Sequence, residues 1–153
     1  MAAEAIKNQV MQALAAMLAE VDGIASVKLE EEFPFDLEDI PVEERPVLFV
    51  WDDSDDSAPA NLMTRHDLAL TLAVFLPMET GGFPAFAAAA ETLAARIHNK
   101  LAAPEALRAV GVIDLTMGPA RKAKAQDNWG ELVLPVRGDY VHAAADAFSL
   151  NLS

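Results

Sequence analysis

Residues 52–56 read Asp-Asp-Ser-Asp-Asp, a density of carboxylates that invites comparison with a calcium-binding loop. Calcium takes several oxygen ligands from one flexible segment. An EF-hand loop that began at Asp52 would need glycine at its sixth position and glutamate at its twelfth. Those positions hold Ser57 and Met63. The spacing therefore does not indicate a calcium site, and the segment is expected to be a solvated loop.

The three histidines, His66, His98 and His142, are scattered along the chain. None has the close histidine spacing of a zinc motif, so a zinc site would have to be assembled entirely by the fold. Asp67 follows His66, but neighbours on a strand point to opposite faces, and no Gly-x-Ser-x-Gly context supplies a hydroxyl nucleophile. The chain has no cysteine. We expect no enzyme activity, no catalytic residues, no cofactor and no metal.

One basic cluster lies in the polar segment between the last two expected strands. Its members are Arg121, Lys122 and Lys124. Such a tip could simply be solvated. It could also complement the acidic segment, because in a head-to-tail ring the basic tip of one subunit can meet the acidic face of the next.

Fourteen of the 24 acidic residues lie between Glu20 and Asp56, where only Lys28 and Arg45 oppose them. Nearly all of the formal charge of −13 therefore comes from this stretch. Proteins that bind DNA tightly neutralise its phosphates with lysine and arginine. Because this chain is acidic, avid DNA binding is not expected. An acidic surface can still suit DNA that must pass without being held.

Targeting signals are not evident in the sequence. No apolar run approaches the ~18 to 20 residues that would cross a bilayer. The first residues lack the basic start and apolar run of a signal peptide. The lack of cysteine fits a reducing compartment. We expect no membrane partner and a location in the cytosol of the producing cell.

Hydrophobic periodicity predicts two main helices and about five strands within one domain, residues 1–153. The helices are expected at 2–20 and 84–101, and the strands at 24–30, 47–51, 68–76, 112–117 and 129–136. Polar connections are expected at 31–45, 52–59 and 118–128, and a C-terminal arm, helical or docked, at 138–153. This order favours an α+β fold, with a mostly antiparallel sheet and the helices packed on one face.

The order and lengths of these elements resemble the tail terminator family of long-tailed phages, of which the minor tail protein U group is a branch. The resemblance rests on the first helix, the Pro-Val-Leu-Phe-Val-Trp strand at 46–51 with the polar insertion after it, the strand 68–76, the helix 84–101 and the closing hairpin. It extends to about Val136. It implies a non-enzymatic virion protein whose hexameric ring caps the tail tube, stops tail polymerisation and forms the head–tail joining surface.

The implied partners are further copies of the chain, the tail tube protein and the head–tail connector, with DNA passing through the channel unbound. The implied location is the neck region of the virion tail, after assembly in the host cytoplasm. The acidic residues that could line the channel or a subunit interface are Asp52, Asp53, Asp55 and Asp56. A head–tail connector or completion protein is an alternative. So is an acidic DNA-mimic inhibitor, which would occupy a basic site on a nucleic-acid enzyme.

Overall fold

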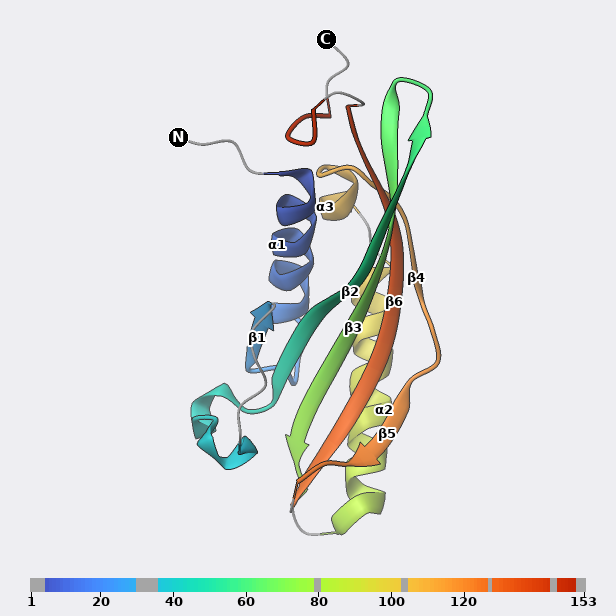
Figure 1. The fold of residues 1–153 in the computed structure, drawn as a ribbon. Helices are drawn as coiled ribbons and strands as arrows, with labels where there is room; N and C mark the ends of the chain where they lie inside the picture. The colour runs from blue at the N-terminus through green and yellow to red at the C-terminus, as the bar shows by residue number, and fades with distance from the viewer. Residues whose placement is uncertain are drawn as a thin grey trace.

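The computed structural model describes residues 5–29, 36–78, 81–102, 105–126, 128–143 and 146–150. Its elements, in chain order, are α1 (Ile6–Ala19), β1 (Ser26–Leu29), the 3₁₀ turns η1 (Leu37–Asp39) and η2 (Val42–Glu44), β2 (Val47–Ala60), β3 (Met63–Pro77), α2 (Gly82–Leu101), α3 (Glu105–Arg108), β4 (Val112–Met117), β5 (Arg121–Lys124) and β6 (Trp129–Ala143). The expected α+β class is confirmed (Figure 1).

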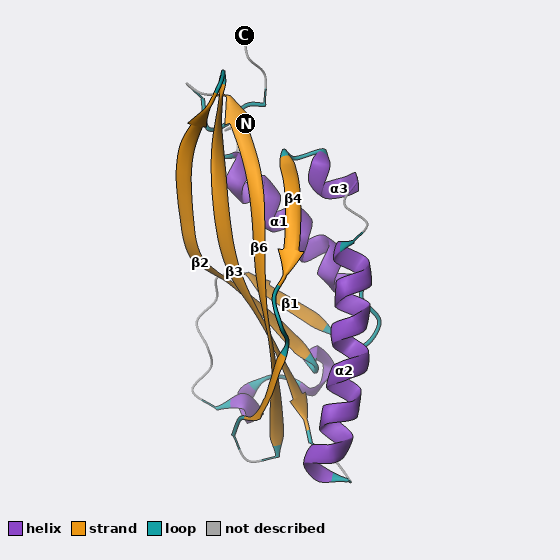
Figure 2. Cartoon of the chain, turned by 90° about the vertical axis from the view of Figure 1, so that its right-hand side faces the viewer, coloured by secondary structure: helices purple, strands orange, loops and turns teal. Residues whose placement is uncertain are grey.

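The strands form one sheet of six, in the order β1-β2-β3-β6-β4. The short strand β5 pairs with residues 130–133 of β6, whereas β4 pairs with residues 136–140. Among the strands that the structure describes, only β1 and β2 are parallel. The long strand β3 pairs with β2 on one side and with β6 on the other over almost its whole length. Figure 2 shows the sheet as one strongly twisted layer, with α1, α2 and α3 on one side of it. The mostly antiparallel sheet is therefore confirmed, with one strand more than expected.

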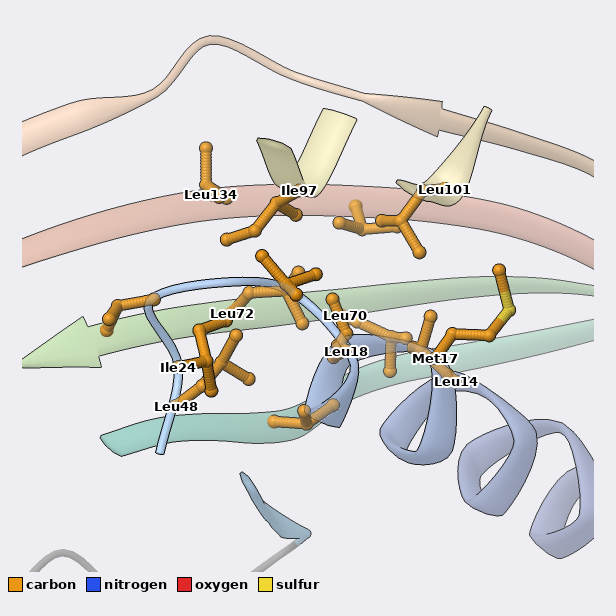
Figure 3. Close-up of a cluster of buried hydrophobic side chains, with 14 of the residues drawn as sticks. Leu14, Met17, Leu18, Ile24, Leu48, Leu70, Leu72, Ile97, Leu101 and Leu134 are labelled. Atoms are coloured by element: carbon orange, nitrogen blue, oxygen red, sulfur yellow. The ribbon is translucent and has the colours of Figure 1, made fainter. Parts of the chain in front are cut away.

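The main core lies between this sheet and the helices. Alternate residues of β2 and β3, such as Leu48, Leu70 and Leu72, point toward the helices and are almost fully buried (Figure 3). The helix α2 packs against these residues with one stripe of apolar side chains, of which Ile97 is fully buried. Residues at three- and four-residue steps share one face of a helix, which is why the sequence pattern identified both long helices. None of the described helices is both long enough and apolar enough to span a membrane.

The other face of the sheet is covered at one end by residues 36–45, the described part of the connection 31–45 that we expected to be solvated. That expectation is wrong for Leu37 and Ile40, which are buried against Phe49 and Phe75 of the sheet. Arg45 lies over the ring of Trp129, 5.1 Å from its centroid. The acidic residues on both sides of Leu37 made this segment look fully exposed in the sequence. A short 3₁₀ turn can nevertheless bury one apolar side chain while the neighbouring carboxylates stay exposed.

The acidic residues 52–56 were expected in a loop, but they belong to β2, which continues to Ala60. The strand pairs with β3 up to Ala60↔Met63, and its register shifts at Asp53, where a bulge interrupts the ladder. A polar strand is stable here because β3 offers a partner of similar length and because, beyond Val50, no described strand covers the other side of β2. Polar side chains that weaken a central strand are tolerated on an edge.

Two further expectations need correction near the C-terminus. The polar segment 118–128 is not a plain loop, because Arg121–Lys124 form β5 and pair with β6. Residues 138–143, which were assigned to a C-terminal arm, complete β6. The described remainder, 146–150, packs back on this end, where the amide of Ala143 donates to the carbonyl of Ser149 at 2.7 Å.

Close packing of α2 on β6 depends on a glycine. A Cβ placed on Gly130 would lie 2.4 Å from ring atoms of Phe86. We expect Gly130→Ala to lower the free energy of unfolding by about 1–3 kcal/mol, because overpacking displaces the ring or the helix. Chemical denaturation would measure this loss. In a double-mutant cycle with Phe86→Ala the penalty should largely disappear, and an equal penalty in both backgrounds would contradict the proposed contact.

Candidate subunit interface

The acidic residues of β2 divide between the two faces of the sheet. Asp52 and Asp55 face α1, where Lys7 forms ion pairs with both, at 3.5 Å for Asp55. Asp53 lies on the opposite face and accepts a hydrogen bond from Thr71 of β3. Asp56 is exposed. The acidic segment 52–56 is therefore divided in two. Asp52 and Asp55 are neutralised by Lys7 within the chain, whereas Asp53 and Asp56 lie on the outer face.

On the face away from the helices, four aspartates lie in one row across the sheet. Asp56 pairs with Asp67, Asp67 with Asp139, and Asp139 with Asp114 in the strand registers. Like charges directly across a sheet repel each other. Arginines relieve part of this repulsion, as where Arg137 Nε lies 3.0 Å from the Asp67 carboxylate. This row, together with Asp53, leaves the outer face of the sheet negative.

The basic residues of β5 divide in the same way. Lys122 lies opposite Leu132 in the register, on the helix side, and forms an ion pair with Glu91 of α2. Arg121 points to the outer face, opposite Val133, and is exposed. Lys124 is exposed as well. Two of the three predicted cations, Arg121 and Lys124, are thus available to a partner.

The acidic and basic segments occupy opposite edges of one sheet. Beyond Val50, no described strand pairs with β2 on the side away from β3. In the same described part of the chain, β5 pairs only with β6. Figure 1 shows β5 near the lower end of the molecule, whereas the hairpin of β2 and β3 rises at the upper end. The carboxylates of β2 and the exposed cations of β5 therefore lie at diagonal corners of the sheet, too far apart to form ion pairs with each other within one chain.

A polar network joins the acidic strand to β3 and β6. His66 Nδ1 lies 2.6 Å from Asp55 Oδ1, and the Tyr140 hydroxyl donates to Asp55 Oδ2 at 2.7 Å. The second nitrogen of His66, Nε2, lies 2.8 Å from Nε2 of His142. The rings of His66 and Tyr140 stack, with centroids 4.5 Å apart. Asp55 therefore anchors three strands, and through Lys7 also the first turn of α1.

The charges of this network are set by their neighbours. Burial disfavours the charged form of Asp55, but hydrogen bonds from Tyr140 and His66 outweigh it and hold the pKa of Asp55 below its usual value. Burial and the nearby Asp55 carboxylate raise the pKa of Tyr140, so its phenol stays protonated. Burial also opposes the charge on Lys7, yet the contacts with Asp52 and Asp55 raise its pKa overall.

The Asp55–His66 pair resembles part of a catalytic triad, but the second imidazole nitrogen of His66 is not free to act as a base. In a triad the second imidazole nitrogen serves the nucleophile. Here that nitrogen is occupied by His142. The 2.8 Å separation is also shorter than the roughly 3.3 Å that tetrahedral zinc would impose on two imidazole nitrogens. Among the described residues, no group of three or more His, Asp or Glu side chains could hold a metal.

Sequence reasoning missed this network. It treated the histidines as scattered, because 76 positions separate His66 from His142. The pairing of β3 with β6 places Thr64 opposite His142 and His66 opposite Tyr140, so the two imidazoles become diagonal neighbours. The one available signal was the alternating pattern of both strands, but that pattern does not reveal which residues face each other.

The network makes a prediction for Asp55. Because Asp55 is the shared acceptor, Asp55→Asn should lower the free energy of unfolding by about 2 kcal/mol at neutral pH. Since its folded pKa is below the ordinary 3.8, this contribution is complete above that pH and is lost as the pH falls through the folded value. The gap between wild type and variant in urea denaturation should therefore close in acid. Asp56→Asn, on the exposed neighbour, is the control and should change stability by less than about 0.5 kcal/mol.

Comparisons with known proteins leave the function open. No protein-family model matches this chain, and no curated protein matches it either. The chain is similar to one in a solved structure described as "Virion of native gene transfer agent (GTA) particle", with 14% identity and a TM-score of 0.37, over 90% of this chain and 92% of that one. A similarity of this size carries no argument about function.

Proposed function

We propose that this protein is a structural component of a phage-type virion. In this proposal, copies assemble head to tail into a ring, a hexamer by the family resemblance. The ring acts as a tail terminator: it caps the tail tube, stops its growth and presents the head–tail joining surface. The observation that carries the proposal is the separation of opposite charges onto the two edges of one sheet.

This separation supports a head-to-tail contact. A heterologous interface joins two different patches, and it closes into a ring when the rotation between neighbours is right. Asp53 and Asp56 on one edge, and Arg121 and Lys124 on the other, are two such patches. Complementary charges fix the register and the partner of an interface more than they raise its affinity. The same acids also protect β2 against uncontrolled pairing with other strands.

The outer face of the sheet supports the second part of the proposal. If this face lines the channel, its row of aspartates would keep the DNA from adhering. Screening limits that repulsion to about 8 Å at physiological salt, so only side chains at the channel wall contribute. Asp53 and Asp56 lie on this face, whereas Asp52 and Asp55 point toward α1 and Lys7. Of these four residues, we therefore propose Asp53 and Asp56 for the subunit contact, and the remaining aspartates of the row, Asp67, Asp114 and Asp139, for the channel lining.

Charge reversal tests the ring contact. Arg121→Glu with Lys124→Glu, or Asp53→Lys with Asp56→Lys, should each weaken self-association by about tenfold or more at low salt, and by less at high salt, because both place like charges together. Mixing the two variants should restore assembly, since each edge then meets its complement in an alternating ring. Sedimentation velocity would measure all three samples. Lys100→Glu with Arg108→Glu, on α2 and α3, changes the net charge by the same amount as the Arg121 and Lys124 reversals and is the control.

Restoration on mixing is the decisive result. If neither reversal changes association, or if the mixed variants stay apart, the edge-to-edge contact is wrong. A DNA-mimic inhibitor would instead remain monomeric and bind a basic protein in a salt-dependent way.

The terminator role has its own test. We expect negative-stain images of the protein, alone or mixed with tail tubes, to show rings with a central hole or caps at tube ends. A particle mass that stays at one chain in both samples would exclude the role. Rings that ignore tube ends would favour a head–tail connector or completion protein.

A further inference from the structure

The two histidines of the polar network contact each other, and each contacts a separate acceptor. Their Nε2 atoms face each other at 2.8 Å. On the far side of each ring, Nδ1 of His66 meets the carboxylate of Asp55 at 2.6 Å, and Nδ1 of His142 meets the carbonyl of Ala143 at 2.8 Å. A carbonyl oxygen and an ionised carboxylate can only accept a hydrogen bond. Both Nδ1 atoms must therefore carry a proton.

The contact between the two Nε2 atoms requires one donor and one acceptor. A neutral imidazole has one N–H group, and an imidazolium has two. A pair of rings that satisfies all these contacts holds one proton more than two neutral rings. We propose that His66 and His142 share a single proton between their Nε2 atoms, and that this shared proton is a pH-sensitive clasp between β3 and the end of β6.

The charged groups around His66 and His142 can balance one positive charge on this pair of rings. Asp55 balances it from β2, and Lys7 on α1 is balanced by Asp52. Tyr140 on β6 stays neutral, because its pKa is raised. Asp146, in the segment that returns to β6, is exposed. A second positive charge on the rings would have no counter-charge within the network.

Either change of protonation breaks the contact. A further proton would set two N–H groups against each other, and loss of the shared proton would set two lone pairs against each other. At about pH 5 both unfolded imidazoles are protonated, so the unfolded chain binds more protons than the clasp and stability rises with pH. At about pH 8 the unfolded rings are neutral and bind fewer, so stability falls.

The clasp lies where several parts of the chain converge. The carbonyl of Ala143 accepts from His142, and the Ala143 amide donates to Ser149 at 2.7 Å. The amide of Ile6, at the start of α1, donates to the carbonyl of Ala147 at 2.9 Å. Opening the clasp would therefore loosen the segment 146–150 and its contact with α1.

Nuclear magnetic resonance of ¹⁵N-histidine-labelled protein tests the shared proton directly. Near pH 6.5 the two rings should show three N–H protons in total and a scalar coupling between the two Nε2 nuclei, carried by the hydrogen bond. The coupling should vanish toward both acid and alkaline pH. Two independent titrations with no coupling at any pH would overturn the proposal.

Thermal denaturation gives a second readout. The Tm difference between wild type and His142→Gln should be largest near about pH 6.5 and smaller by several degrees at about pH 5 and about pH 8. His98→Gln is the matched control, because His98 is exposed on α2, and its Tm should follow wild type throughout. A difference for His142→Gln that does not vary with pH would contradict the clasp even if the variant is less stable.

Discussion

The pairing of β3 with both neighbours is the constraint on which the rest of the structure depends. β3 is bonded to β2 and β6 along almost its full length, so its register fixes which residues of three strands share a face. A slip of one residue would turn every side chain of a strand to the opposite face. It would expose Leu70 and Leu72 and separate His66 from Tyr140. The hydrophobic core and the polar network are thus held by the same hydrogen-bond ladders.

The polar network continues the core rather than interrupting it. On the helix side of β3, the apolar row ends at Leu68, and His66 is the next residue with the same orientation. Beyond that point polar side chains take the place of aliphatic ones, and Tyr140 and His142 are buried there. Asp55 satisfies both His66 and Tyr140, which removes the cost of burying them unpaired.

The charge distribution follows from the sheet having two unlike edges. The edge of β2 combines carboxylates, a bulge at Asp53 and Pro59, three features that discourage pairing with other strands. The other edge, at β5, is basic. An acidic protein with one basic edge strand has a built-in direction, and this asymmetry is what the proposed head-to-tail ring would use. The overall charge alone would only keep the chains apart.

The sequence by itself determined the class of fold, both long helices and most strand positions, because the spacing of apolar residues reports local geometry directly. It also identified Arg121, Lys122 and Lys124 as a separate basic cluster. Only the tertiary structure decided that residues 52–56 continue β2, that Leu37 is buried, and that Asp55, His66 and His142 meet. Polar residues carry little strand signal of their own, and their partners are chosen by register between segments that are far apart in the chain.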